Sequence, residues 1–212
     1  MSHDAAPHSQ SRRDRWNERY ADAERVWSAE PNEHVAQIVV ELMEQGSAGA
    51  ALDLGAGEGR HALWLAEQGW QVTAVDFAQV GLDRGSADAT ARGLAQQIEW
   101  VTADVTTWAP EDTVSKHDGY DLVLIAFLHV PEDVLARAVD WLRPGGALVL
   151  VGHALRNLTD GHGGPQDPDL LYSADQLRTK AVGLHIERLE EVDRVTAEGR
   201  TAIDIVLVGR RT

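Results

Sequence analysis

The sequence predicts an α/β fold, a doubly wound and mostly parallel sheet of seven strands that ends in an antiparallel hairpin. Two observations predict it. Between residues 50 and 151, short apolar runs alternate with helical segments, which is typical of parallel strands joined by crossover helices. Two longer runs, 185–195 and 201–208, then flank a turn that contains glycine, as the strands of a hairpin do. The length of 212 residues suits one sizeable domain.

The N-terminal region is expected to lie outside the sheet. Residues 1–13 are polar and show no periodicity, so we expect a disordered lead there. A helix is predicted over 15–29, and a second helix begins after Pro31. Residues 14–46 therefore form a helical cap, and the domain itself covers 47–212.

The elements of the domain follow in regular order. Each predicted strand is a short apolar run bounded by glycine, proline or aspartate, as buried parallel strands are. Each predicted helix has apolar positions at helical spacing. The first five strands are predicted at 50–54, 71–75, 98–103, 121–128 and 147–151, and the helices at 61–68, 80–92, 131–142 and 173–181.

Charge and composition limit the classes of molecule that this protein is expected to bind. The chain has 34 acidic and 19 basic residues, a formal charge of −15, which repels nucleic acid. It has no cysteine, so disulfides, thiolate metal sites and a cysteine nucleophile are excluded. The N-terminus lacks the apolar core of a signal peptide, and the longest apolar run is too short to span a bilayer. We expect a cytoplasmic protein, a monomer or a homodimer, with neither nucleic acid nor membrane as partner.

A glycine-rich segment follows the first strand. Residues 53–60 read Asp-Leu-Gly-Ala-Gly-Glu-Gly-Arg, and the glycines allow a sharp turn and close approach of a ligand to the backbone. A dinucleotide site prefers G-x-G-x-x-G, but Arg60 occupies the last glycine position of that pattern. Asp53 and Glu58 would also oppose a pyrophosphate at the helix N-terminus. The segment favours a ligand that carries positive charge and no phosphate.

Two further carboxylates follow the next two strands. Asp76 is placed to accept hydrogen bonds from both hydroxyls of a ribose. Asp104 can accept from an adenine amino group while the Val105 amide meets a ring nitrogen, and Phe77 can lie against the adenine face. One aspartate at a strand end is often only a helix cap, but three at successive strand ends indicate a nucleoside site.

The order of these motifs resembles the class I S-adenosylmethionine-dependent methyltransferase superfamily. DLGAGEGR, VTAVDFA, VTADV, YDLVLIAFLHVP and LRPGGALVLVG resemble five of its motifs in sequence order. The resemblance implies a Rossmann-like fold and S-adenosylmethionine as cofactor. WNERY at 16–20, Trp27 and GEGRHALWLA further resemble the tellurite-resistance and thiopurine-type small-molecule branch. The predicted cofactor contacts are Asp53, Gly55, Ala56, Gly57, Asp76, Phe77, Asp104, Val105 and Ala126.

Candidate catalytic and lid residues surround this cofactor site. His129, just after the fourth strand, is the predicted general base if the acceptor must lose a proton, and His153 is a second candidate. His129 can alternatively cap the next helix or line the pocket. Trp16, Tyr20 and Trp27 form an aromatic stripe that serves either as core or as a lid that excludes water.

The predicted function is methyl transfer to a small molecule. The segment 126–131 lacks the D/N-P-P-Y/F run of enzymes that methylate exocyclic base nitrogens or protein amides. The loop 160–169 contains His162, Asp167 and Asp169 without ligand spacing, so no metal site is expected. The alternatives are a catalytically silent module that binds S-adenosylmethionine and, less favoured, an NAD-dependent oxidoreductase.

Overall fold

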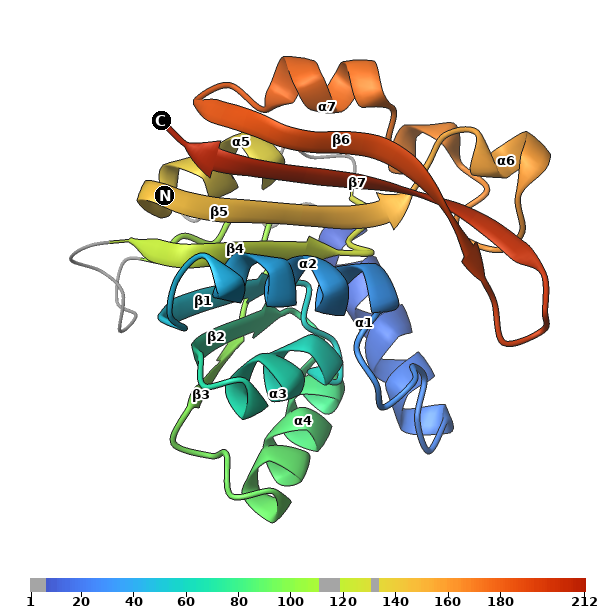
Figure 1. Ribbon diagram of the computed structural model, residues 1–212. Coiled ribbons are helices and arrows are strands. Elements are labelled where there is room, and N and C mark those ends of the chain that lie inside the picture. The colour runs from blue at the N-terminus through green and yellow to red at the C-terminus, as the bar shows by residue number, and fades with distance from the viewer. Residues whose placement is uncertain (1–6, 111–118, 131–133) are drawn as a thin grey trace, which may run out of the picture.

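The seven strands form one sheet, in which five parallel strands are extended by an antiparallel hairpin. The computed structural model describes residues 7–110, 119–130 and 134–212. The strand order is β3-β2-β1-β4-β5-β7-β6, with β7 antiparallel to both of its neighbours (Figure 1). The predicted fold class is confirmed. The strands are β1 (Ala50–Leu54), β2 (Gln71–Asp76), β3 (Ile98–Thr102), β4 (Tyr120–Ala126), β5 (Leu142–His153), β6 (Leu184–Val195) and β7 (Thr201–Arg211).

Helices cover both faces of this sheet (Figure 1). One apolar cluster packs α2, α3 and α4 against one face, and a second packs α5 and α7 against the other. Central strands buried on both faces explain why they read as unbroken apolar runs. The helices are α1 (Pro7–Asp22), α2 (Glu33–Glu44), α3 (Arg60–Glu67), α4 (Gln79–Ala91), α5 (Val134–Asp140), α6 (Asn157–Asp160) and α7 (Ala174–Lys180), and a 3₁₀ turn spans Pro168–Leu170. In the part of the chain that the structure describes, no helix is long and apolar enough to cross a membrane.

The first helix differs from its predicted bounds. It runs over Pro7–Asp22 instead of 15–29, so it begins inside the segment expected to be a disordered lead. Residues 1–6 of that lead lie outside the described residues. The amides of Val26 and Trp27 donate to the carboxylate of Glu58 at 3.0 and 3.1 Å. Because these donors are engaged elsewhere, a helix cannot continue through Trp27.

The fifth strand is longer than the sequence predicts. A Pro-Gly-Gly run after residue 143 reads as a turn, yet β5 begins at Leu142. Leu142 pairs with Tyr120 across a register shift, and the Tyr120 amide donates to Trp141 O at 2.9 Å. This pairing extends the strand before the glycines. The helix expected over 131–142 ends at Asp140, and its residues 131–133 lie outside the described part of the chain.

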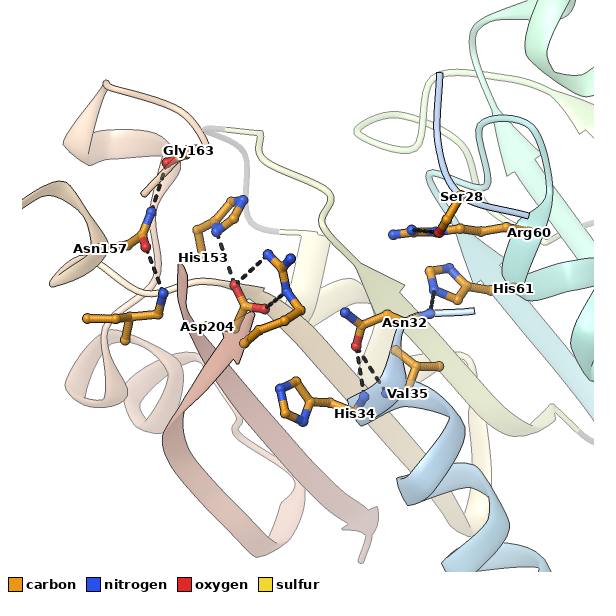
Figure 2. A network of polar contacts seen from close by, with 12 residues as sticks. Ser28, Asn32, His34, Val35, Arg60, His61, His153, Asn157, Gly163 and Asp204 are labelled. Carbon is orange, nitrogen blue, oxygen red and sulfur yellow. Dashed lines mark hydrogen bonds and ion pairs between the residues drawn. The ribbon is translucent and has the colours of Figure 1, made fainter. Parts of the chain in front are cut away.

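The second helix is attached to the third by one polar contact. The Asn32 side chain caps α2 by accepting from the amides of His34 and Val35 at 3.0 and 3.3 Å. The Asn32 amide donates to His61 Nε2 at 3.2 Å (Figure 2). Burial and then the charge of Arg60 lower the pKa of His61 well below its usual value, so the ring stays neutral and can accept.

Trp100 fits against two glycines that bring α4 close to the glycine-rich loop. A Cβ atom on Gly59 would lie 2.4 Å from the Trp100 ring, and one on Gly85 would lie 2.5 Å from it. The Cβ on Gly85 would also lie 2.9 Å from the Glu58 carbonyl oxygen. Glycine at 85 therefore sets the distance between α4 and the loop that precedes α3.

We expect Gly85→Ala to lower the free energy of unfolding by about 1–3 kcal/mol, because the ring and the loop must both move. Chemical denaturation measures this change. Gly46→Ala is the matched control, since a Cβ there meets no atom within 4 Å, and it should stay within about 0.5 kcal/mol of the wild type. A Gly85→Ala protein as stable as the wild type would contradict this packing.

Candidate active site

Three predicted carboxylates meet at one edge of the sheet. Asp53 lies near the end of β1, Asp76 ends β2, and Asp104 follows β3. These strands are parallel neighbours, so their carboxyl ends lie side by side. Burial raises the pKa of Asp76, hydrogen bonds from backbone amides oppose this, and the charge of Asp104 raises it further. The three side chains therefore share one electrostatic environment.

The glycine-rich loop is fastened to the end of β2. The amides of Gly55 and Ala56 donate to Val75 O at 2.8 and 3.1 Å, and Gly57 N donates to Asp76 Oδ2 at 2.9 Å. Gly55 and Gly57 have φ values of 77° and 58°, which favour glycine. Each carboxylate oxygen has two lone pairs, so Asp76 can hold the loop and still accept from ligand hydroxyls.

Asp53 lies beneath this loop with an unused acceptor. It is 1% exposed, and its Oδ2 atom has no hydrogen-bond partner among the described residues. Burial raises the pKa of Asp53 to about 7, and the nearby Arg60 charge opposes the rise. A buried carboxylate in this state fits a ligand that brings positive charge, and it opposes a phosphate.

The remaining predicted cofactor residues lie around this edge. Asp104 Oδ1 accepts from the amide and the hydroxyl of Thr106 at 3.0 and 2.7 Å, a local turn that fixes the carboxylate. Val105 and Ala126 are buried, at 2% and 8% exposure, and Phe77 is half-buried. All nine predicted residues lie at the carboxyl ends of β1 to β4 or just after them.

The N-terminal aromatic residues pack directly on the loop. The Trp16 ring centroid lies 5.6 Å from that of Tyr20 and 5.9 Å from that of Trp27. Trp27 Nε1 donates to the Tyr20 hydroxyl at 3.2 Å. A Cβ atom on Gly57 would lie 2.6 Å from that hydroxyl, so the aromatic cluster closes over the loop at its smallest residue.

Glu58 holds this cluster in place. Its side chain is 3% exposed, its Oε2 accepts from Val26 and Trp27, and its Oε1 accepts from Arg84 at 3.0 Å. The sequence predicts that the Glu58 charge opposes a phosphate. In the structure the Glu58 carboxylate is paired with Arg84 and two backbone amides, whereas Asp53 Oδ2 has no partner among the described residues.

A second cluster lies at the ends of β4 and β5. His129 and His153 stack with ring centroids 5.3 Å apart and an angle of 13° between the planes. The Phe127 ring centroid lies 5.3 Å from that of His153. The backbone of Phe127 has a positive φ of 55°, which is uncommon outside glycine. Both predicted histidines are therefore brought together, next to Ala126 of the predicted cofactor set.

A small cavity of about 70 Å³ lies beside Leu128 and Val130, between the end of β4, α5 and α7. None of the predicted cofactor residues lines it. The cavity is thus separate from the edge that carries Asp53 and Asp76. Its lining includes Ile125, Leu128, Val130, Leu150, Leu170, Leu171, Tyr172 and Leu177, with Asp169, Gln176 and Lys180 among the polar groups.

Comparison with known proteins agrees with this geometry. Residues 51–146 match the family model described as a methyltransferase domain. This segment, 96 of the 212 residues, is similar to a methyltransferase domain. The match agrees with the predicted superfamily and with S-adenosylmethionine as the predicted cofactor. Asp53 meets the requirement of that cofactor, which carries an ammonium and a sulfonium group and no phosphate.

The chain is similar to curated methyltransferases and to solved structures. The tRNA 5-carboxymethoxyuridine methyltransferase of Escherichia coli K12 is 31% identical over 121 residues, which cover 52% of this chain and 44% of that protein. The chain spans about half the length of the curated relatives it matches. NodS from Bradyrhizobium japonicum WM9, an N-methyltransferase solved with S-adenosyl-L-homocysteine, has a TM-score of 0.66 at 16% identity, over 93% of this chain and 97% of that one. TehB from Haemophilus influenzae has a TM-score of 0.65 at 17% identity, over 83% of this chain and 62% of that one.

The sequence did not indicate several residues that border the histidine cluster. Asp204 and Arg194 come from the hairpin, and Tyr172 comes from the segment before α7. A lone aspartate inside an apolar strand run was the one available signal, for Asp204. The guanidinium groups of Arg60 and Arg194 lie 5.8 and 5.3 Å from the Phe127 ring centroid.

We expect Glu58→Gln to loosen the N-terminal segment over the loop. An amide has one acceptor oxygen where the carboxylate has two, and loss of a hydrogen bond to a buried charge costs about 1.5–3 kcal/mol. Hydrogen exchange at the Val26 and Trp27 amides should accelerate at least about tenfold. Glu67→Gln, which changes an exposed pair with Arg92, should leave these amides unchanged. Equal exchange in the two variants would contradict the role of Glu58.

We expect the pKa of Asp53 to make cofactor affinity depend on pH. With a pKa of about 7, Asp53 gains its negative charge as pH rises through neutrality and loses it in acid. Binding of S-adenosylhomocysteine, which keeps the ammonium group, should weaken at least about tenfold between roughly pH 7.5 and pH 5.5. Calorimetry over this range measures it. Asp53→Asn should bind S-adenosylhomocysteine weakly at every pH and lose most of the pH dependence. If the variant keeps the pH dependence of the wild type, another group causes that dependence.

Proposed function

We propose that this protein transfers a methyl group from S-adenosylmethionine to a small-molecule acceptor. The observation that carries the proposal is the adjacency of two sets of residues. The edge with Asp53 and Asp76 suits the cofactor, and the cluster of Phe127, His129 and His153 begins one residue beyond Ala126, at the end of β4. Bound S-adenosylmethionine supplies an activated methyl group on its sulfonium sulfur.

Each set of residues has a distinct task in this proposal. Asp76 accepts from the ribose hydroxyls, Asp104 and Val105 meet the adenine, and Asp53 faces the ammonium group. Tyr20 and Trp27, held over the loop by Glu58, exclude water from the reacting groups. Orientation of two reactants and exclusion of water can together supply about 7–11 kcal/mol of the barrier.

A small acceptor is favoured over nucleic acid. The formal charge of −15 repels a phosphate backbone, and the N-terminal aromatic cluster covers the loop that a large substrate would need to approach. The similarity to a tRNA methyltransferase, over about half of either chain, makes tRNA the second candidate. A cytoplasmic location belongs to the same proposal, supported by the absence of cysteine from the sequence.

An acceptor screen with methyl-labelled S-adenosylmethionine tests the proposal. The panel contains thiols, phenols, amines, tellurite and bulk tRNA, and we expect label on at least one small molecule and none on tRNA. Asp76→Ala should weaken S-adenosylhomocysteine binding more than tenfold, because it removes the acceptor for the ribose and the anchor of Gly57, as calorimetry would show.

Three outcomes would overturn parts of this proposal. Label on tRNA alone would replace the small-molecule acceptor. Tight binding of S-adenosylhomocysteine without transfer to any member would favour a silent binding module. Stabilisation by NAD(H) and not by S-adenosylhomocysteine in a thermal shift assay would favour an oxidoreductase.

A further inference from the structure

Three charged or titratable side chains meet where the hairpin joins the parallel sheet. His153 at the end of β5 and Asp204 in β7 are direct partners in the antiparallel ladder. His153 Nδ1 lies 3.1 Å from Asp204 Oδ1 (Figure 2). Arg194 of β6 donates from Nε to Asp204 Oδ2 at 2.6 Å. Neither Asp204 nor Arg194 belongs to the predicted cofactor set.

Asp204 is a buried carboxylate that keeps its charge. It is 0% exposed. Burial alone would raise its pKa, but the hydrogen bonds and charges of His153 and Arg194 outweigh burial and lower it. An ionised carboxylate 3.1 Å from Nδ1 favours the tautomer with the proton on that nitrogen and a lone pair on Nε2. The same charge stabilises the imidazolium that forms when Nε2 accepts a proton.

The His153 ring is held from several sides. It stacks on His129, and a Cβ atom on Gly164 would lie 2.5 Å from its Cδ2 atom, so only glycine fits there. Asn157 fixes the adjoining loop by donating to Gly163 O at 2.8 Å and accepting from Ile203 N at 2.7 Å (Figure 2). The ring is therefore oriented by packing as well as by Asp204.

His129 is a poor candidate for a base. Its Nδ1 lies 2.8 Å from Leu170 O, a carbonyl that can only accept, so the ring donates there. Burial lowers the pKa of His129 to about 4, and the hydrogen bond to Leu170 only partly offsets this. His129 is neutral near pH 7 and resists protonation, which suits a wall of the site better than a proton acceptor.

We propose that His153 is the general base of methyl transfer and that Asp204, braced by Arg194, is its positioning residue. The inference rests on the proposed function and narrows the acceptor to a small molecule whose accepting atom carries a dissociable proton, as in a phenol or a thiol. That proton passes to His153 Nε2 and then to solvent. The acceptor's freed electron pair forms the new bond to the methyl carbon, and the sulfur keeps the electron pair of the bond that breaks.

Substituted phenols and thiophenols, whose own pKa values lie on both sides of the assay pH, test this assignment. His153→Asn keeps an amide donor toward Asp204 and removes Nε2, and His129→Asn likewise keeps a donor toward Leu170. For acceptors that are protonated at the assay pH, His153→Asn should lower kcat by about 10²–10⁴-fold. For acceptors already ionised, kcat should change little, and S-adenosylhomocysteine affinity should stay at the wild-type value.

The controls separate this inference from the proposed function. His129→Asn should change kcat by a similar factor for every acceptor in the series. Asp204→Asn should, like His153→Asn, lower kcat for the protonated acceptors, but by a smaller factor. If His153→Asn lowers kcat equally for all acceptors, or for none, the base assignment is wrong. Transfer by the wild type would still uphold the proposed function in that case. Absence of transfer by the wild type to every member would overturn the acceptor class.

Nitrogen-15 spectra of the imidazole rings give a readout that needs no acceptor. In the wild type the neutral His153 ring should carry its proton on Nδ1. In Asp204→Asn the signals should shift toward a mixture of the two tautomers, with the fold intact by circular dichroism. A wild-type His153 ring protonated on Nε2, or spectra unchanged by Asp204→Asn, would overturn the positioning role of Asp204.

Discussion

Parallel pairing of β1 with both β2 and β4 is the constraint on which the candidate site depends. The register places Asp53 beside Ala74 and Leu124, and it brings the carboxyl ends of the central strands to one edge. The backbone hydrogen bonds of that edge are then completed by the glycine-rich loop, whose amides donate to Val75 O and to Asp76. The carboxylates are thus positioned by the sheet, and the ligand-binding geometry follows from strand pairing.

The same loop also organises the N-terminal segment. Glu58 is buried, and a buried carboxylate without partners is strongly unfavourable. Its partners are the amides of Val26 and Trp27 and the guanidinium of Arg84, so the N-terminal segment and α4 are both attached to one loop residue. Order in the covering segment is therefore coupled to order in the loop that it covers.

The sequence predicts the elements whose signal is local. Buried strands such as β1 and β4 read as apolar runs, and the turn before β7 contains Gly199. The ends of α1 and β5 were not predictable, because they depend on Glu58 and on the pairing of Tyr120 with Leu142.

The candidate site divides in the same way. The carboxylates follow successive strands and can be found from order alone. The contact between His153 and Asp204 joins residues 51 positions apart through the register of an antiparallel pair, which spacing does not reveal. Likewise, nothing in the pattern around Glu58 distinguishes a charge that faces a ligand from one that is neutralised inside the protein.

The place of β7 in the sheet has a consequence for how the molecule is made. β7 follows β6 in the sequence but lies between β5 and β6 in space. During synthesis, β5 and β6 leave the ribosome before β7, the strand that lies between them. Until β7 is made, one edge of β5 has no pairing strand. Asp204 lies in β7, so the pairing of β7 in the sheet also places Asp204 beside His153. A chain that stops short of residue 204 would have the cofactor edge without the group that orients its base.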